Sequence, residues 1–121
     1  MDSKNKKLKI IEFISNIEVY RRMYIGVRDF DKAMKIEDKL ISQMERIVKV
    51  YNEKLSVYRD KKNKAVKEGA SLEKLSEINK EFNDMREKEI ELELFYITKE
   101  QAREAGFNPL ELNLIKEFIK N

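Results

Sequence analysis

The sequence predicts a mainly α-helical protein built on a long antiparallel helical hairpin, with short flanking helices and one short extended segment near residues 89–97. The chain of 121 residues holds only 3 Gly and 1 Pro, so few positions force a turn. Apolar residues make up 41% and charged residues 40% of the chain, a balance typical of helices with one solvated side. The length suits a single domain, residues 1–121, with one core.

A short first helix is expected from about Asn5 to Ile14, because Leu8, Ile11 and Ile14 recur at helical spacing. The following sequence SNIE, residues 15–18, predicts a break. Its Ser and Asn compete with the helix for backbone hydrogen bonds and are good caps for the helix that follows.

The main element is a long helix, expected from about Ile17 to Lys67, with possible interruption at Gly26 and at residues 29–31. Apolar residues follow one another at steps of three and four: Ile36, Leu40, Met44, Ile47, Tyr51, Leu55 and Tyr58. A second row repeats every seven residues, as in a coiled-coil seam: Met34, Ile41, Val48 and Leu55.

Two further apolar residues of this helix, Val50 and Val57, lie off the row that faces the next helix. A contact between two helices therefore leaves them uncovered. This predicts a second apolar contact, and we expect the protein to form a homodimer or a higher homo-oligomer.

The turn of the hairpin is expected at residues 67–71, with the sequence KEGAS. Gly69 can take the left-handed conformation that ends a helix, and Ser71 can cap the next one. The third helix then carries an apolar stripe of Leu72, Leu75, Ile78, Phe82 and Met85. A turn this short makes the two helices antiparallel neighbours.

The segment Glu89–Ile97 has two consistent interpretations. As a helix it continues the apolar stripe of the third helix, and as a strand it alternates three glutamates with Ile90, Leu92 and Leu94. We favour the strand, whose backbone groups need a partner. That partner is expected to be a symmetry mate or the sheet edge of another protein. The candidate partner-binding residues are therefore Glu91, Glu93, Leu94, Phe95 and Tyr96.

Two helix starts are expected in the last part of the chain. The sequence TKEQ, residues 98–101, fits a capping box, and Gly106 can close that short helix. The sequence NPLE, residues 108–111, combines an Asn cap, a Pro at the first helical position and a Glu three residues after the cap. The final helix has an apolar face that should dock on the hairpin: Leu110, Leu114, Ile115, Phe118 and Ile119.

The residue types present argue against an enzyme. The chain has no Cys and no His, which excludes a disulfide, a thiolate zinc site, a cysteine nucleophile and a Ser–His–Asp triad. Glu89, Glu91 and Glu93 could attract a hard cation, but on a strand they stand about 7 Å apart and fan outward. A solvated acidic edge is the favoured interpretation, and we expect no catalytic activity, metal or cofactor.

Hydropathy gives no sign of a membrane segment. No apolar run approaches the roughly 20 residues that span a bilayer. The basic start of the chain is a poor signal peptide, because its apolar part is broken by Lys9, Glu12 and Asn16. We expect a cytoplasmic protein without membrane contact.

Charge is unevenly spread along the chain. Residues 1–70 carry 18 Lys and Arg against 11 Asp and Glu, a net charge of +7, whereas residues 71–121 carry 8 against 12, a net charge of −4. The favoured interpretation is that the two halves attract each other. The alternative is a nucleic-acid-binding face, for which the candidate phosphate contacts are Lys61, Lys62, Lys64 and Lys67.

Part of the sequence resembles small proteins of unknown function from phages and prophages of low-GC bacteria. The resemblance rests on LSEINKEFNDMREKEIELELFYI, on AGFNPLELNLIKEF and on QMERIVKVYNEK, and covers about the last two thirds of the chain. It implies a helical hairpin, a short extended piece and a terminal helix. It also implies a phage-encoded accessory protein, and it carries over no active-site residue.

Together these patterns favour a non-catalytic protein-binding module. Its expected role is that of a phage-type accessory protein that inhibits a host protein, such as a defence effector, or assists assembly. The alternative function is a helical nucleic-acid-binding protein that uses the basic N-terminal half.

Overall fold

The computed structural model describes residues 2–120. Within them the protein is mainly helical, at 69% helix, with one continuous helical stretch of 38 residues and two small two-stranded sheets. The predicted mainly α class is confirmed. The elements are β1 (Ser3–Lys9), α1 (Ile10–Ser15), α2 (Ile17–Arg22), α3 (Phe30–Lys35), η1 (Ile36–Ile41), α4 (Ser42–Lys67), α5 (Leu72–Arg86), β2 (Glu89–Phe95), β3 (Ile97–Thr98), α6 (Lys99–Ala105), α7 (Pro109–Ile115), η2 (Lys116–Phe118) and β4 (Ile119–Lys120).

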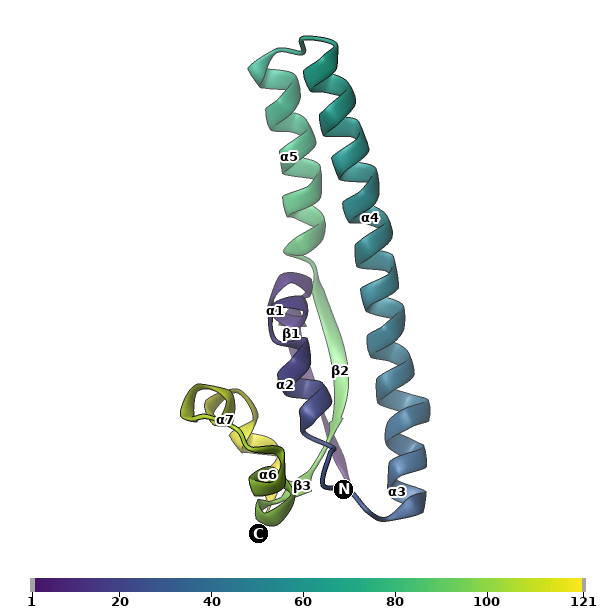
Figure 1. Cartoon of the computed structure of the whole chain (residues 1–121), viewed down its shortest axis with the longest axis vertical. Helices are drawn as coiled ribbons and strands as arrows, with labels where there is room; N and C mark the ends of the chain where they lie inside the picture. The colour runs from purple at the N-terminus through teal and green to yellow at the C-terminus, as the bar shows by residue number, and fades with distance from the viewer. Residues whose placement is uncertain (1, 121) are drawn as a thin grey trace.

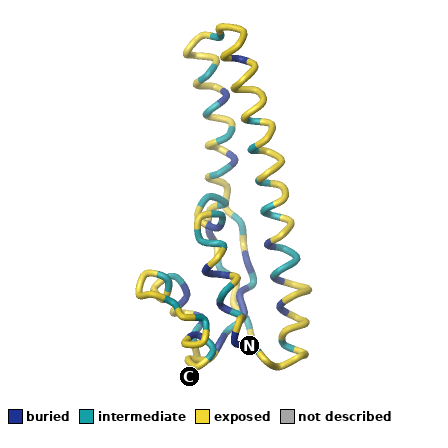
Figure 2. Tube along the Cα trace, viewed as in Figure 1, coloured by how far each residue is buried: buried dark blue, intermediate teal, exposed yellow. Residues whose placement is uncertain are grey.

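The molecule has two regions of different build (Figure 1). The arm, residues 49–86, is the part of α4 beyond Val48 together with the turn and α5, and it projects as two helices lying side by side. The base consists of all the other described residues, and it gathers both sheets and the short helices around one core. The burial pattern follows this division, because most buried residues lie in the base (Figure 2).

The acidic segment is a strand, as expected, but it pairs inside the chain. β2 runs antiparallel to β1, with Lys7 opposite Glu91 and Lys9 opposite Glu89. Opposite charges on facing residues stabilise such a pair. The expected partner, a symmetry mate or the sheet edge of another protein, is therefore wrong for this edge of β2. The attraction between the basic and acidic halves of the chain is realised here.

The first helix begins only at Ile10, so the helix predicted over residues 5–14 is wrong in its first half. The reason is long-range pairing. Four lysines give residues 3–9 little strand preference of their own, and the strand forms because a glutamate-rich partner lies beside it. The break expected at residues 15–18 is present as a turn at Asn16 between α1 and α2.

The core lies where the sheet meets α1, α2, η1 and the C-terminal segment. Leu92 and Leu94 of β2 are fully buried, and Phe13 stacks near Tyr20 with ring centroids 6.3 Å apart. The largest fully buried side chains are Tyr20, Phe13, Phe118, Met23, Leu40, Met44, Leu92, Leu94, Ile97 and Ile115. None of them belongs to the arm, and no residue of the arm is among the partly buried hydrophobics that pack against this core.

The long helix predicted from Ile17 is interrupted, and the continuous stretch begins at Phe30. Asp29 caps it by accepting a hydrogen bond from the Lys32 N–H at 2.8 Å. Gly26, in the interruption, lies against α6. A Cβ atom at this position would stand 2.9 Å from the Cα of Gln101, so only glycine allows this approach.

The local signals for helix ends are confirmed. Ser71 caps α5, and Thr98 and Asn108 form capping boxes at the starts of α6 and α7. Gly69 has the left-handed φ that the sequence predicts, at 68°, and Gly106, which ends α6 as expected, also has a left-handed φ, at 69°.

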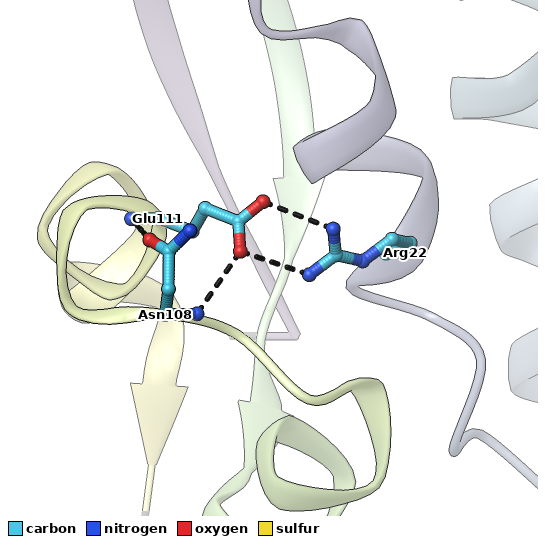
Figure 3. Close-up of polar contacts among 3 residues, drawn as sticks. All are labelled: Arg22, Asn108 and Glu111. Carbon is cyan, nitrogen blue, oxygen red and sulfur yellow. Dashed lines mark hydrogen bonds and ion pairs between the residues drawn. The ribbon is translucent and has the colours of Figure 1, made fainter.

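The C-terminal segment docks on the base rather than on the α4–α5 pair, which corrects the expectation for its apolar face. Ile115 and Phe118 are fully buried in the base core, whereas Leu110 is 82% exposed. One polar anchor is Arg22 of α2, whose guanidinium donates to both carboxylate oxygens of Glu111 at 2.9 and 3.0 Å (Figure 3). Glu111 also accepts from the Asn108 N–H, and the Arg22 bonds, with this one, hold the pKa of its carboxyl below the usual value.

Candidate protein-binding surface

The two helices of the arm are held together by a small aromatic cluster. The rings of Tyr58 and Phe82 stack with centroids 4.4 Å apart, and Tyr51 lies 6.1 Å from Phe82. The Tyr58 hydroxyl also donates to the Asn79 side-chain oxygen at 2.6 Å. These contacts fix which side of α4 faces α5.

The residues singled out as lying off the apolar row are indeed left uncovered. Val50 is 49% exposed and Val57 is 53% exposed. They are seven residues apart, which is two helical turns or about 10 Å, and so lie on one side of α4. Together they form an apolar line at the boundary between the two helices.

This line is one wall of a groove between α4 and α5 with a volume of about 460 Å³. Its lining residues are Val50, Glu53, Lys54, Val57, Tyr58, Lys61, Ile78, Glu81, Phe82 and Met85. A second hollow continues it toward the base and shares Val50, Lys54 and Met85 with the first. That hollow also reaches Ile10 and Ile90, so the apolar floor runs from the middle of the arm to the sheet.

The rim of the groove carries both signs of charge. Glu53 and Lys54 line one side, and Lys61 forms an ion pair with Glu81 of α5 at 3.3 Å. Both partners of that pair are largely exposed, so it contributes little to stability. An apolar floor with a mixed polar rim is the usual build of a protein–protein contact.

The sequence-predicted partner-binding residues do not form one exposed surface. Leu94 and Phe95 are buried in the core, at 0% and 3% exposure, so their side chains are not accessible to a partner. Tyr96 is half-buried, and its ring lies 6.1 Å from that of Phe118. Glu91 is exposed and Glu93 is half-buried and accepts a hydrogen bond from the Ser3 hydroxyl at 2.8 Å. The apolar members of this set stabilise the fold.

The four candidate phosphate contacts are exposed but do not share a face. Residues advance about 100° around a helix per position, which distributes Lys61, Lys62, Lys64 and Lys67 over more than half of its circumference. Lys61 is paired with Glu81, and Lys62 lies over the Tyr58 ring at 5.7 Å. Lys64 lines a hollow together with Glu68 of the turn and Glu77 and Glu81 of α5.

Sequence reasoning missed the side chains that close the outer edge of β2. The Tyr24 hydroxyl accepts from the Phe95 N–H at 3.0 Å and donates to the Phe95 C=O at 3.2 Å. The Gln43 side chain donates to the Glu91 C=O at 3.0 Å. Burial raises the pKa of the Tyr24 phenol, although its hydrogen bond to Phe95 acts in the opposite direction. The sequence holds no local signal for these contacts, which join residues far apart in the chain.

Comparison with protein-family models, curated proteins and solved structures finds no match to this chain. The resemblance to small phage proteins accordingly stays an expectation from the sequence. Within residues 2–120, no helix combines the length and the apolar character needed to cross a membrane. Over the same residues, no acidic side chains gather in a group that could hold a metal ion.

Proposed function

We propose that the protein is a non-catalytic protein-binding module that acts in the cytoplasm and receives an amphipathic helix in the groove of its arm. In this proposal α4 and α5 act as the antiparallel helical hairpin that the sequence predicts. The observation that carries the proposal is the pair of half-exposed valines, Val50 and Val57, beside a floor formed by Ile78, Phe82 and Met85.

The groove sets the chemistry of its occupant. Two valines about 10 Å apart fit a helix with apolar residues spaced by seven, because both helices then present one side chain every two turns. The alternating charges of Glu53, Lys54, Lys61 and Glu81 favour a helix with acidic and basic residues flanking its apolar stripe.

The arm of a second copy meets these requirements, since α4 itself presents such a line. Self-association through the arm is therefore the form of the proposal that we would test first. The resemblance to small phage proteins favours a heterologous partner. This partner is a host protein that the contact inhibits, or a component of an assembly in which the protein acts as an accessory.

The test compares sedimentation velocity of the wild-type chain with the double variant Val50→Asp/Val57→Asp. Both positions are half-exposed, so the substitutions leave the base core intact. A matched control is Val66→Asp, because Val66 is 59% exposed on the same helix and does not line the groove. We expect a dimer for the wild type and the control, and a 14.5 kDa monomer for the double variant.

A wild-type chain that stays at 14.5 kDa at tens of micromolar would rule out self-association. The same three proteins would then be used as bait in host lysate. A partner captured by the wild type and the control but not by the double variant supports the heterologous form. Equal capture by all three baits contradicts a role for the groove.

Nucleic-acid binding is the alternative, and it has less support because the four arm lysines are dispersed and one is paired with Glu81. If it occurs, it should be weak and should fall steeply with salt. Nuclease treatment of the lysate and a Lys61→Glu/Lys62→Glu/Lys64→Glu/Lys67→Glu variant separate it from the groove contact. Retention that survives nuclease but is lost in the lysine variant would show that these lysines serve a protein partner instead.

A further inference from the structure

The two edges of the β1–β2 ladder differ in how they are closed. The alternation of an antiparallel ladder tells which residues point their backbone groups outward. The Ile10 N–H donates to the Lys88 C=O and the Tyr96 N–H donates to the Asp2 C=O, both at 2.9 Å. Even-numbered residues of β1 therefore face β2, and its odd-numbered residues face away from it.

The outer edge of β2 is closed by side chains. The Tyr24 hydroxyl hydrogen-bonds with both the N–H and the C=O of Phe95, and the Gln43 side chain donates to the C=O of Glu91. The outer edge of β1 is different. Among residues 2–120, no strand and no hydrogen bond meets the outward N–H and C=O groups of Asn5 or Lys7. At its far end the edge closes again, because the Lys9 N–H donates to the Glu12 carboxylate at 3.1 Å.

The charge of β1 selects what could pair with this open stretch. Its sequence, SKNKKLK, carries four lysines. Lysine on an edge strand protects against indiscriminate pairing, and a second copy of β1 would place lysines against lysines. An acidic strand would instead place glutamates against these lysines. The chain contains an example, because the inward edge of β1 pairs with β2, EIELELF, which places Glu91 opposite Lys7 and Glu89 opposite Lys9.

Lys7 is the best placed of these lysines to receive another acidic residue. Lys4 and Lys6 both form ion pairs with Glu117, at 3.4 and 3.2 Å, and Lys9 pairs with Glu87. Lys7 is exposed and, among the residues that the structure describes, forms no ion pair within 4.0 Å. Lys7 faces Glu91 on β2 without forming an ion pair with it, and its exposed side chain can also face an acidic residue on the open side of β1.

We propose that the open edge of β1 is a docking site for an extended acidic segment of another protein, which adds to the sheet as a third strand beside Asn5 and Lys7. The backbone groups of these two residues supply the hydrogen bonds. Acidic residues at alternate positions of the incoming strand lie on the same face as Lys7 and Lys9. This contact is independent of the groove in the arm, since it uses neither α4 nor α5.

The test is a titration of the ¹⁵N-labelled 121-residue chain with a synthetic peptide, EIELELFY, the sequence of residues 89–96. A control peptide replaces its three glutamates with lysines. We expect saturable chemical-shift changes of the Asn5 and Lys7 amides with the acidic peptide. The basic peptide should bind at least about tenfold more weakly, because like charges then face each other across the ladder.

Two variants test strand addition directly. Asn5→Pro removes an outward N–H while every inward hydrogen bond to β2 stays possible, and proline is tolerated on edge strands in this orientation. Asn5→Ala is its matched control. We expect the proline variant not to bind the acidic peptide and the alanine variant to bind it as the wild type does. Should the Leu92 and Leu94 amides show that the proline variant is misfolded, Lys7→Glu takes its place and should weaken binding of the acidic peptide.

Several outcomes would overturn the proposal. One is the absence of shifts at Asn5 and Lys7 with millimolar peptide, and another is equal binding of the two peptides. Shifts that report the release of β2 would mean that the peptide replaces the strand rather than adding to the sheet. A single-stranded oligonucleotide that reproduces the β1 shifts, and keeps them in Asn5→Pro, would make this edge a polyanion contact instead.

Discussion

The arm contains 38 of the 119 described residues and the base contains the other 81, but the base holds 15 of the 18 buried hydrophobic residues. In the base, β1, β2, the short helices and the start of the long helix enclose a common core (Figure 2). In the arm, Ala65, Ile78 and Met85 are the buried residues. Two helices side by side can cover only one stripe on each other, so the arm depends on a few contacts and keeps apolar surface exposed. Most of the burial that stabilises the fold therefore lies in the base, and the arm carries the exposed apolar surface that we propose for binding.

The largest effect on stability is expected from truncating a buried side chain in the base. Leu94→Ala removes a fully buried side chain between the sheet and the short helices, and should cost about 2–5 kcal/mol in the free energy of unfolding. Urea unfolding followed by circular dichroism measures this. A cost below about 0.5 kcal/mol, which is typical of surface sites, would contradict the placement of Leu94 in the core.

Truncating a side chain in the arm should have a smaller effect on stability, confined to the arm. Phe82→Ala removes the ring that stacks on Tyr58, which contributes about 1 kcal/mol beyond the area that it buries. Limited trypsin digestion with mass spectrometry should show earlier cleavage within residues 49–86, while fragments of the base persist. Simultaneous loss of both regions would mean that the arm and the base unfold as one unit.

The helix ends and the acidic strand could be predicted from the sequence, because their signals are local. Ser71, Thr98 and Asn108 bond to backbone groups three residues away, and the alternation in β2 lies within seven residues. β1 could not be recognised this way, because its partner residues lie 80 to 92 positions away and its lysines resemble a solvated helix face. The charge asymmetry between the two halves was the one sequence observation that anticipated their attraction.

The candidate site was predicted in part. Val50 and Val57 stand off the main apolar row in the sequence, and the structure leaves them exposed. The apolar end of β2 was misinterpreted as a binding surface. Whether Leu94 and Phe95 are exposed depends on Tyr24 and on the C-terminal segment, and no pattern within residues 89–97 reports what covers them.

Acid should loosen the C-terminal segment of the base. Its ion pairs with Arg22 and Lys6 lower the pKa values of Glu111 and Glu117 in the folded protein. A carboxyl with a lowered folded-state pKa contributes stability above its unfolded value, near 4.3, and loses it as the pH falls further. The thermal midpoint should therefore drop below about pH 4.5. A Glu111→Gln/Glu117→Gln variant should have a lower thermal midpoint than the wild type at pH 7, and its midpoint should change less with pH. A dependence of the midpoint on pH as steep as that of the wild type would contradict this.

The smallest effects are expected from removing one helix cap in each region, which compares the arm and the base through the same kind of substitution. Ser71→Ala and Thr98→Ala each remove a helix cap worth about 1 kcal/mol, one at the tip of the arm and one in the base. Thr98→Ala should lower the thermal midpoint of the whole protein, whereas Ser71→Ala should only increase fraying near the turn. Equal midpoints for the two variants, both below that of the wild type, would argue against the division.

Native-state hydrogen exchange tests the division of the molecule most directly. The amides of Leu92 and Leu94 in β2 are compared with those of Ile78 and Phe82 in α5, in one sample. We predict that the β2 amides exchange only through global unfolding, whereas the α5 amides exchange through a local opening with a lower free energy. The same opening free energy for both sets would contradict the account, because the arm would then share the stability of the base.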